Sequence, residues 1–407
     1  MRRVFLGMFL LFLATAAAFG QSSKRKGGAE GKTAPRYLYV WAGHDARTES
    51  DAMLVVDITA GSPTYGKVVR AVSVGSIGNE PHHIGLSPDG GTIVAGGLLS
   101  GRVFFFDIKG DAARPRLAKV FEAAQLGLGV ADEVKPLADR GVLVSMMGDH
   151  HAASPGGMVL FDAKMEMVSH GPHDPPDHDL NIHDFDIVPS ANLLLTTDFV
   201  IPHTLIEGAP QVRDTVRLWD LNQLRILHTL HVGKGPWITK FIPGTKLAMV
   251  SCFVDGTLWL VDAGANPPTA KQVYDFDGDQ NNSMPSIMEI SRDGKWLFEA
   301  LYGHDQVVQL DISEPAKPRR ASEVITGKGP HYIRLSPDGR SLFVSNYFVE
   351  AGKTVLKGDN HVKRIEVTAK GLELDKGFDV DLNGSGAYVA GVKAPSGAMR
   401  PHGLVVH

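Results

Sequence analysis

The sequence predicts an all-β fold, a single seven-bladed β-propeller whose ring is closed by pairing of N- and C-terminal strands. Two repeating strand signatures, and the division of one repeat between the two chain ends, predict this architecture. The 407 residues include 45 glycines and 24 prolines, which is typical of many short strands joined by tight turns. We expect a signal peptide over 1–20, a disordered linker over 21–35 and the propeller over 36–407.

The N-terminal segment has the pattern of an export signal. Arg2 and Arg3 precede an apolar run, Val4–Phe19, which ends in small residues, so we expect cleavage near Gly20. The alternative is an uncleaved membrane anchor, for which the run is rather short. We therefore expect a periplasmic or secreted protein that has no membrane contact after cleavage.

The first repeated signature is an apolar strand that ends in an acidic residue. A propeller blade is one supersecondary unit, so a repeat of roughly 50 residues is the spacing to seek. Seven copies occur: Met53–Asp57, Val103–Asp107, Met158–Asp162, Val216–Asp220, Leu258–Asp262, Val307–Asp311 and Val362–Glu366.

The second signature is a strand, a tight turn and another strand. Pro, Asp and Gly fill its turns because Pro presets φ, Asp bonds the backbone and Gly permits positive φ. Each copy precedes a copy of the first signature, so the two together give the inner strands A, B and C of a blade. The clear copies are Ile84–Ala95, Ile287–Phe298 and Ile333–Val344, and the weaker ones are Leu137–Ser145, Val188–Thr196 and Ile242–Val250.

One blade is divided between the ends of the chain. Arg36–Trp41 is expected to be a strand B and Met53–Ile58 its strand C, but no strand A precedes them. His402–His407 at the C-terminus supplies the missing strand A. Pairing the two ends closes the ring and removes exposed sheet edges.

Histidine recurs at one position of the innermost strand. When the seven strands A are aligned on their turns, four blades place a histidine at the same depth, although only 17 of 407 residues are histidine. The equivalent residues in blades 1 to 7 are His82, Asp132, His183, Trp237, Ser286, His331 and His402. Because inner strands converge on the propeller axis, we expect the four imidazoles to hold one metal ion.

The type of ligand limits which metal ions the site would bind. Neutral imidazoles suit copper, iron or zinc and disfavour calcium or magnesium. The alternative is that the histidines bond backbone groups at strand starts in a wet channel. His83 follows His82, so strand alternation points it away and favours an indirect role, unless a bend at the strand start reverses it.

Other residues at the strand starts are candidates for supporting roles. Asp132 and Glu133 are expected to accept protons or to orient a ligating imidazole, although solvent-exposed loop charge is the alternative. Trp237, Ser286 and Asp184 are expected to line the pocket.

The remaining features exclude some partners and roles. The net charge of -4 gives no reason to expect a nucleic acid as a partner. Cys252 is the single cysteine, so no intrachain disulfide can form. It sits in a strand-like run, where a buried small residue is favoured over a catalytic thiol. The loop over 199–214 is long enough to act as a lid.

Several segments of the chain carry a recognisable pattern: Ser50–Ile58, Ser62–Val69, His82 with His83, Gly101–Ile108, Ala113–Leu117, Gly157–Asp162 and Leu310–Arg319. In these segments the chain resembles the selenium-binding protein family, which includes methanethiol oxidase. The resemblance is scattered over most of the chain and is most specific in its first quarter. The chain departs from the family in blade 2, where Asp132-Glu133-Val134 stands in place of a histidine-containing run, and it lacks the family's cysteine-bearing N-terminal region.

The resemblance implies a propeller fold and, in bacterial members, a periplasmic copper-dependent oxidase. The family reaction converts methanethiol, oxygen and water into formaldehyde, hydrogen sulfide and hydrogen peroxide. His82, His83 and His402 fall where the family has histidines, whereas His183 and His331 are not general features of the family.

Three functions therefore compete. The first is a copper-dependent oxidase that acts on a small sulfur compound with O2. The second is an iron-dependent oxygenase with the same four ligands, by analogy of fold with the carotenoid-cleaving oxygenases. The third is a propeller that binds a metal, a ligand or a partner without catalysis.

Overall fold

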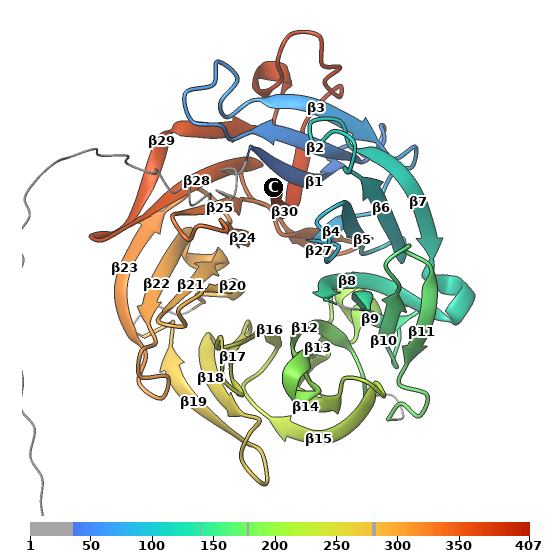
Figure 1. The fold of residues 1–407 in the computed structure, drawn as a ribbon, viewed down its shortest axis with the longest axis vertical. Coiled ribbons are helices and arrows are strands. Elements are labelled where there is room, and N and C mark those ends of the chain that lie inside the picture. Colours follow the sequence, from blue (N-terminus) through green and yellow to red (C-terminus); the bar gives the residue numbers. More distant parts are fainter. Residues whose placement is uncertain (1–35, 139, 177–178, 279–281) are drawn as a thin grey trace, which may run out of the picture. The chain divides into compact units, whose positions relative to one another are not determined.

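The computed structural model describes residues 36–138, 140–176, 179–278 and 282–407. The expected signal peptide and linker lie outside these residues. Seven four-stranded antiparallel sheets are arranged in a ring around a central axis (Figure 1). The predicted seven-bladed β-propeller is confirmed.

Each blade runs from an innermost strand at the axis to an outermost strand at the rim. The first three blades in chain order comprise β4 (Pro81–Leu86), β5 (Thr92–Gly97), β6 (Arg102–Asp107) and β7 (Arg116–Glu122); β8 (Leu128–Leu137), β9 (Gly141–Asp149), β10 (Gly157–Phe161) and β11 (Met167–Gly171); and β12 (Ile182–Val188), β13 (Leu193–Val200), β14 (Val212–Asp220) and β15 (Arg225–His231).

The next three blades follow the same order. They comprise β16 (Pro236–Phe241), β17 (Leu247–Cys252), β18 (Thr257–Asp262) and β19 (Thr269–Asp275); β20 (Pro285–Ile290), β21 (Trp296–Leu301), β22 (Gln306–Asp311) and β23 (Arg319–Ile325); and β24 (Tyr332–Leu335), β25 (Ser341–Ser345), β28 (His361–Thr368) and β29 (Gly371–Asp381).

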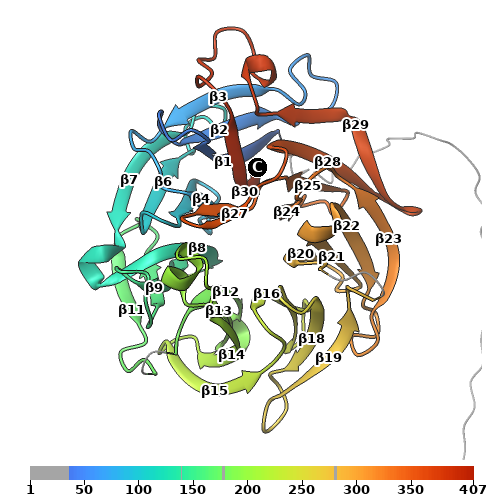
Figure 2. The same ribbon diagram turned by 180° about the vertical axis from the view of Figure 1, so that it is seen from behind.

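The seventh blade joins the two ends of the described chain. Its order is β30 (Met399–Val406), β1 (Tyr37–His44), β2 (Ala52–Asp57) and β3 (Val68–Ser73), with β30 innermost. β30 pairs antiparallel with β1, for example Leu404 with Val40 (Figure 2). The predicted closure by a C-terminal strand A is confirmed, and it leaves no blade short of a strand.

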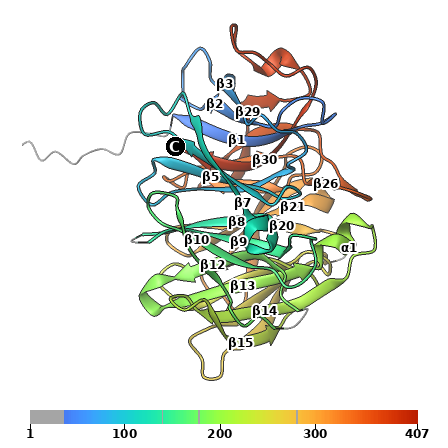
Figure 3. The ribbon, with the colours of Figure 1, turned by 90° about the vertical axis from the view of Figure 1, so that its right-hand side faces the viewer.

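Two insertions rise from loops between the second and third strands of their blades. The helix α1 (Pro202–Ile206) lies between β13 and β14, and a hairpin of β26 (Val349–Ala351) and β27 (Thr354–Leu356) lies between β25 and β28. Figure 3 shows α1 and β26 at the same end of the propeller. The four short 3-10 helices of the described residues are Ala123–Leu126, Pro189–Ala191, Tyr302–His304 and Ser385–Ala387.

The turns between strands A and B form as their residue types predict. In the first blade the Ser87 hydroxyl donates to Asp89 Oδ1 over 2.6 Å and accepts from the Thr92 amide over 2.9 Å. Gly90 adopts a φ of +68°, a conformation that costs glycine little. Ser336 and Asp338 repeat the hydroxyl–carboxylate contact at 2.6 Å in the sixth blade.

Burial follows the position of each strand within its blade. The second strand β5 is buried at nearly every residue, because it packs between the neighbouring blades. The outermost strand β7 alternates between exposed and partly buried residues, as a half-solvated strand does. Among the described residues no helix is long and apolar enough to cross a membrane.

Candidate metal centre

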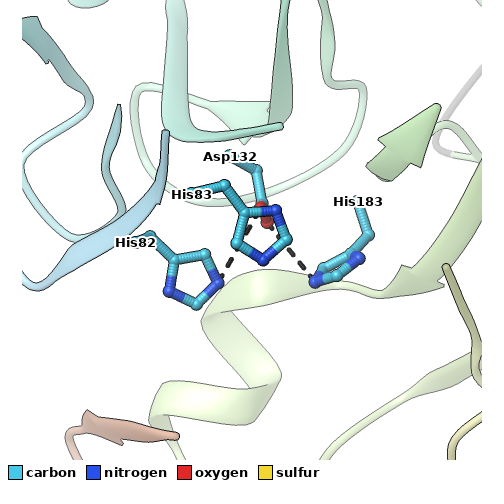
Figure 4. Close-up of side chains that lie close together, drawn as sticks. All are labelled: His82, His83, Asp132 and His183. Carbon is cyan, nitrogen blue, oxygen red and sulfur yellow. Dashed lines mark ion pairs between the residues drawn. The ribbon is translucent and has the colours of Figure 1, made fainter. Parts of the chain in front are cut away.

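Six potential metal ligands meet at one end of the innermost strands. His82 and His83 come from β4, Asp132 from β8, His183 from β12, His402 from β30, and His331 immediately precedes β24. None of these side chains is more than 2% exposed. Figure 4 shows the first three and His183, which converge from three adjacent blades.

Two overlapping groups of these ligand atoms are each compact enough to hold a metal ion. In one group, His82, His83, Asp132 and His183 each offer an atom within 4.8 Å of the others, and in a second group His83, His331 and His402 do so. His83 belongs to both groups. The ring centroids of His82 and His402 are 3.9 Å apart, and those of His331 and His402 are 4.7 Å apart. The structure thus brings together the four histidines that the sequence singles out.

His83 faces the same cluster as His82, so the alternation expected from an ideal strand is wrong here. The two rings are parallel within 2°, with centroids 4.7 Å apart. The cause is an irregularity in the pairing of β4 with β5, whose register shifts between Pro81 and Ile84. Such a bulge lets two consecutive side chains point the same way.

The bulge recurs at the start of other inner strands. Register shifts fall between Ala131 and Val134 in β8, and between Ile182 and Phe185 in β12. β16 and β20 have equivalent shifts, and so does the pairing of β30 with β1. This shared distortion sits at the depth of the aligned axial residues.

Three histidines have one ring nitrogen fixed by an acceptor. Nδ1 of His183 donates to the Trp237 carbonyl over 2.8 Å, and Nδ1 of His402 donates to the Phe348 carbonyl over 2.8 Å. Nδ1 of His83 lies 2.6 Å from Glu133 Oε2. In the neutral ring these contacts place the proton on Nδ1 and leave the Nε2 lone pair free, which is how ligating histidines are oriented in metalloproteins.

The free nitrogens are buried and have no hydrogen-bond partner within the described part of the chain. They include Nε2 of His83, His183 and His402, together with both ring nitrogens of His331 and Nδ1 of His82. Burial lowers the pKa of all five imidazoles, and the neighbouring histidines lower the pKa values of His82 and His331 further. Neutral imidazole is the form that binds a metal.

Asp132 is the carboxylate at the centre of the cluster. Its Oδ1 lies 3.1 Å from His83 Nδ1 and 3.7 Å from His82 Nε2, and its Oδ2 lies 3.6 Å from His183 Nε2. Neither oxygen has a hydrogen-bond partner in the described structure. Burial and the nearby carboxylates of Glu133 and Asp184 raise the pKa of Asp132 well above its usual value. A cation bound beside Asp132 would favour the ionised form of this buried carboxyl group.

These residues fit a transition metal. Neutral imidazole nitrogens and one carboxylate form a donor set suited to copper, iron or zinc, and their unpartnered atoms are what a metal ion would satisfy. The alignment of the seven strands A places Asp132 at an axial position, and the sequence predicts that it accepts a proton or orients a ligating imidazole. Its position amid three imidazoles makes it a potential ligand as well.

Glu133 acts on the cluster through His83. Its Oε2 holds His83 Nδ1, and its Oε1 lies 3.0 Å from Lys135 Nζ. Burial favours a higher pKa, but the Lys135 ammonium and His83 hold the pKa of Glu133 well below its usual value. Both carboxylate oxygens are therefore engaged, and the contact fits the orienting role expected for this residue.

The three expected pocket residues differ in what they do. Trp237 packs on His183 with ring centroids 3.7 Å apart and lines a cavity beside the cluster. Ser286 instead donates to the His331 carbonyl over 3.1 Å, and it is not among the residues that line this cavity. Asp184 Oδ2 accepts the Thr239 amide over 2.7 Å, and burial, followed by the Glu133 carboxylate, raises the pKa of Asp184 to about 7.

A small apolar cavity of about 50 Å³ lies against the histidines. His82, His183 and Trp237 line it, and the other lining residues are Leu98, Met147, Phe199, Leu205, Phe253, Phe348, Val349 and Leu356. Phe348 also stacks on His331, with ring centroids 4.2 Å apart and planes 21° apart.

Three aromatic residues of this cavity are not among the residues predicted to line the pocket. Phe199, Phe253 and Phe348 lie at or just after the second strands of three blades. An aromatic residue at that point in several blades is the signal that was available.

Comparison with known proteins places the chain in a family. The family model of the 56kDa selenium binding protein matches residues 27–403. The methanethiol oxidase of Hyphomicrobium sp is 26% identical, with 86% of this chain and 83% of the relative covered, and that of Rattus norvegicus is 24% identical, with 82% and 86% covered.

Solved structures share the fold. The hypothetical selenium-binding protein from Sulfolobus tokodaii superposes with a TM-score of 0.80 at 21% identity, covering 93% of this chain and 95% of that one. The periplasmic gluconolactonase of Pseudomonas aeruginosa gives 0.63 at 15% identity, covering 91% and 98%. The family match spans more than nine-tenths of the sequence, so the chain belongs to the 56kDa selenium binding protein family.

Proposed function

We propose that this protein is a metal-dependent oxidase of small thiols, of the methanethiol oxidase kind, with copper as its metal and O2 as its oxidant. The observation that carries the proposal is the cluster of five buried imidazoles and Asp132, whose free atoms face one another on the axis. Two relatives that cover most of the chain carry the name methanethiol oxidase.

Copper is preferred because the donor set is rich in nitrogen. Imidazole ranks among the best ligands for copper, and divalent copper heads the general affinity order for such sites. Iron is the second candidate, because Asp132 among histidines gives the mixed histidine–carboxylate set common in non-haem iron enzymes. Zinc also accepts this set but performs no redox chemistry.

The bound metal would supply a Lewis acid that lowers the pKa of the thiol and a redox centre for its oxidation. The residues of the chain exclude water, orient a ligand and accept a proton. Trp237 and Phe199 help form a dry apolar wall that excludes water from the cavity. Glu133 holds His83 in its orientation. Asp132 is the carboxylate whose oxygens are free to take the thiol proton.

We also propose that the protein works in the periplasm or outside the cell. The support is the export-signal pattern of the first 20 residues, which lie outside the described structure. Cell fractionation with an antibody, together with the N-terminal sequence of the mature protein, tests this proposal. A full-length protein in the cytosolic fraction would contradict it.

Turnover of methanethiol tests the function. The copper-loaded protein should consume O2 and release hydrogen sulfide, whereas the His183→Ala variant should do neither at a comparable rate. Iron-loaded protein, prepared anaerobically, separates the two metals by its activity and its electron paramagnetic resonance spectrum. A folded, metal-loaded protein that oxidises no thiol would overturn the proposal.

A further inference from the structure

Three neighbouring cavities extend from an outer surface to the histidine cluster. The outer one, of about 260 Å³, has a mixed lining, in which Asp149 and the exposed His150 and His151 are the charged or titratable residues and Leu128 is one of the apolar ones. The middle one, of about 50 Å³, lies beneath α1 and has Pro202 and Ile206 in its wall. The inner one, also about 50 Å³, is the cavity against the histidines described above.

Each cavity shares lining residues with the next one along the row. Leu99, Val130 and Ala152 line both the outer and the middle cavity. Leu98, Met147 and Leu205 line both the middle and the inner cavity. These shared side chains separate each cavity from the next.

The two insertions, α1 and the β26–β27 hairpin, lie beside this row of cavities. Leu205, on α1, has its carbonyl bonded by the Thr354 hydroxyl over 2.6 Å, and the next carbonyl, that of Ile206, accepts the Lys353 amide over 2.8 Å. On the other side the His203 amide donates to the Ala152 carbonyl over 2.7 Å. The loop expected over 199–214 and expected to be a lid is shorter in the structure, because its ends belong to β13 and β14. Its helix α1 borders the middle cavity and is bonded to the β26–β27 hairpin.

The chemistry of the two sides of the cluster differs. The middle and inner cavities have almost purely apolar walls, apart from His82 and His183. Beyond His83 lies the buried pair of Glu133 and Lys135, 3.0 Å apart. A charged molecule loses hydration in an apolar cavity without compensation, whereas a small neutral apolar molecule does not. The apolar side is therefore the one that suits a neutral thiol and O2.

We propose that these three cavities form the entry route to the histidine cluster, and that Leu98, Met147 and Leu205 filter what passes. The route selects small, uncharged, apolar molecules of a few heavy atoms, such as short alkanethiols in their neutral form, and excludes charged or long-chain thiols. The identity of the thiol rests on the function proposed above, whereas the route itself does not.

Leu205 is the residue through which to test the filter, because it is half-buried on the covering helix and lines both inner cavities. Leu205→Phe should fill the junction and Leu205→Ala should widen it. Leu227→Phe makes the same change on β15 at a side chain that is 38% exposed, and it serves as the matched control.

Xenon binding in pressurised crystals tests the route without an enzyme assay, because apolar cavities bind xenon. We expect xenon in the middle and inner cavities of the unmodified protein and of Leu227→Phe. Its occupancy in both should fall in Leu205→Phe. Xenon in neither cavity of the unmodified protein, or the same occupancy in Leu205→Phe, would overturn the proposal.

Thiol kinetics test the selectivity at constant metal content. Leu205→Phe should lower kcat/KM for methanethiol about tenfold, the effect expected of a methylene-sized steric change in an apolar pocket. Leu205→Ala should raise the ratio of butanethiol to methanethiol kcat/KM by about the same factor. If Leu205→Phe oxidises methanethiol at the normal rate, the route fails and the function stands. If xenon binds as expected while no thiol is oxidised, the route stands and the function fails.

Discussion

Single residues at the cluster differ in how firmly the protein holds them. His183 and His402 each donate Nδ1–H to a backbone carbonyl, whereas His331 has neither ring nitrogen bonded within the described residues and is fixed by stacking on Phe348. Backbone carbonyls are rigid acceptors, so His183 and His402 are preorganised. Either ring nitrogen of His331 is available to bind a metal, because neither is engaged in a hydrogen bond within the described residues.

Removing either of the two axial histidines that are not shared with the family, His183 or His331, should therefore reduce metal binding. We expect His183→Ala and His331→Ala each to lose the bound metal at stoichiometric loading while remaining folded, because each substitution deletes a free nitrogen from the cluster. His228→Ala, on the exposed face of β15, is the control. Metal analysis and circular dichroism check both points. Unchanged metal content in both variants would favour a scaffold in which the histidines have a structural role.

Glu133 should tune the metal site without binding the metal itself. Glu133→Gln removes the carboxylate from His83 Nδ1 and should weaken metal affinity about tenfold to a hundredfold, the range typical of such supporting contacts. It also leaves Lys135 without its partner. A Glu133→Gln/Lys135→Met variant separates the two effects, because it should regain stability but not affinity. Metal titration monitored by competition with a chelator gives the result, and equal affinity in all three proteins would refute the orienting role.

The sequence predicts which histidines meet, but not every orientation. Alignment on the Pro-Asp-Gly turns identifies His82, His183, His331 and His402 because inner strands of a propeller share a common depth. It misplaces His83, because a register shift is a property of strand pairing rather than of residue type. The contacts of Asp132 depend on an equivalent register shift in β8, so no pattern in the chain reveals them.

At the scale of elements, close packing of the inner strands fixes the cluster. A methyl group at Gly403 in β30 would overlap the His82 carbonyl oxygen in β4. Strand β30 therefore approaches β4 as closely as it does because residue 403 has no side chain.

Gly403→Ala should disturb both the fold and the site. We expect a loss of about 2 kcal/mol in the free energy of unfolding, the usual scale of overpacking, and weaker metal binding, because His82 and His402 flank the overlap. Gly384→Ala is the control, since a methyl group there would have no neighbour within 4 Å. Denaturant titration and metal titration measure the two effects. Equal behaviour of both variants would contradict this account of the strand approach.

For the whole molecule, closure of the ring is the dominant constraint. β30 lies against β1 and bears His402, so the last strand completes both the sheet and the cluster. The fold follows from the repeats along the chain, because seven copies of one strand pattern leave few other arrangements.

Removing β30 should abolish cooperative folding. A chain that ends at residue 398 exposes the edge of β1 and loses an inner strand, so we expect a broad thermal transition and aggregation. A circular permutant that joins β30 to β1 and opens between β15 and β16 keeps every strand and should fold. Calorimetry and size-exclusion chromatography compare them. A cooperative transition in the shortened chain would show that closure is dispensable.

Metal content is the most direct test of the central claim that the axial histidines hold a redox metal. Elemental analysis of the purified protein, before and after reconstitution and removal of excess metal, should give about one tightly bound copper or iron ion per chain. Chelation should lower the melting temperature, and readdition should restore it, because a metal that binds only the folded state stabilises it. If the folded protein holds no stoichiometric transition metal and binds none tightly when offered, the account is contradicted.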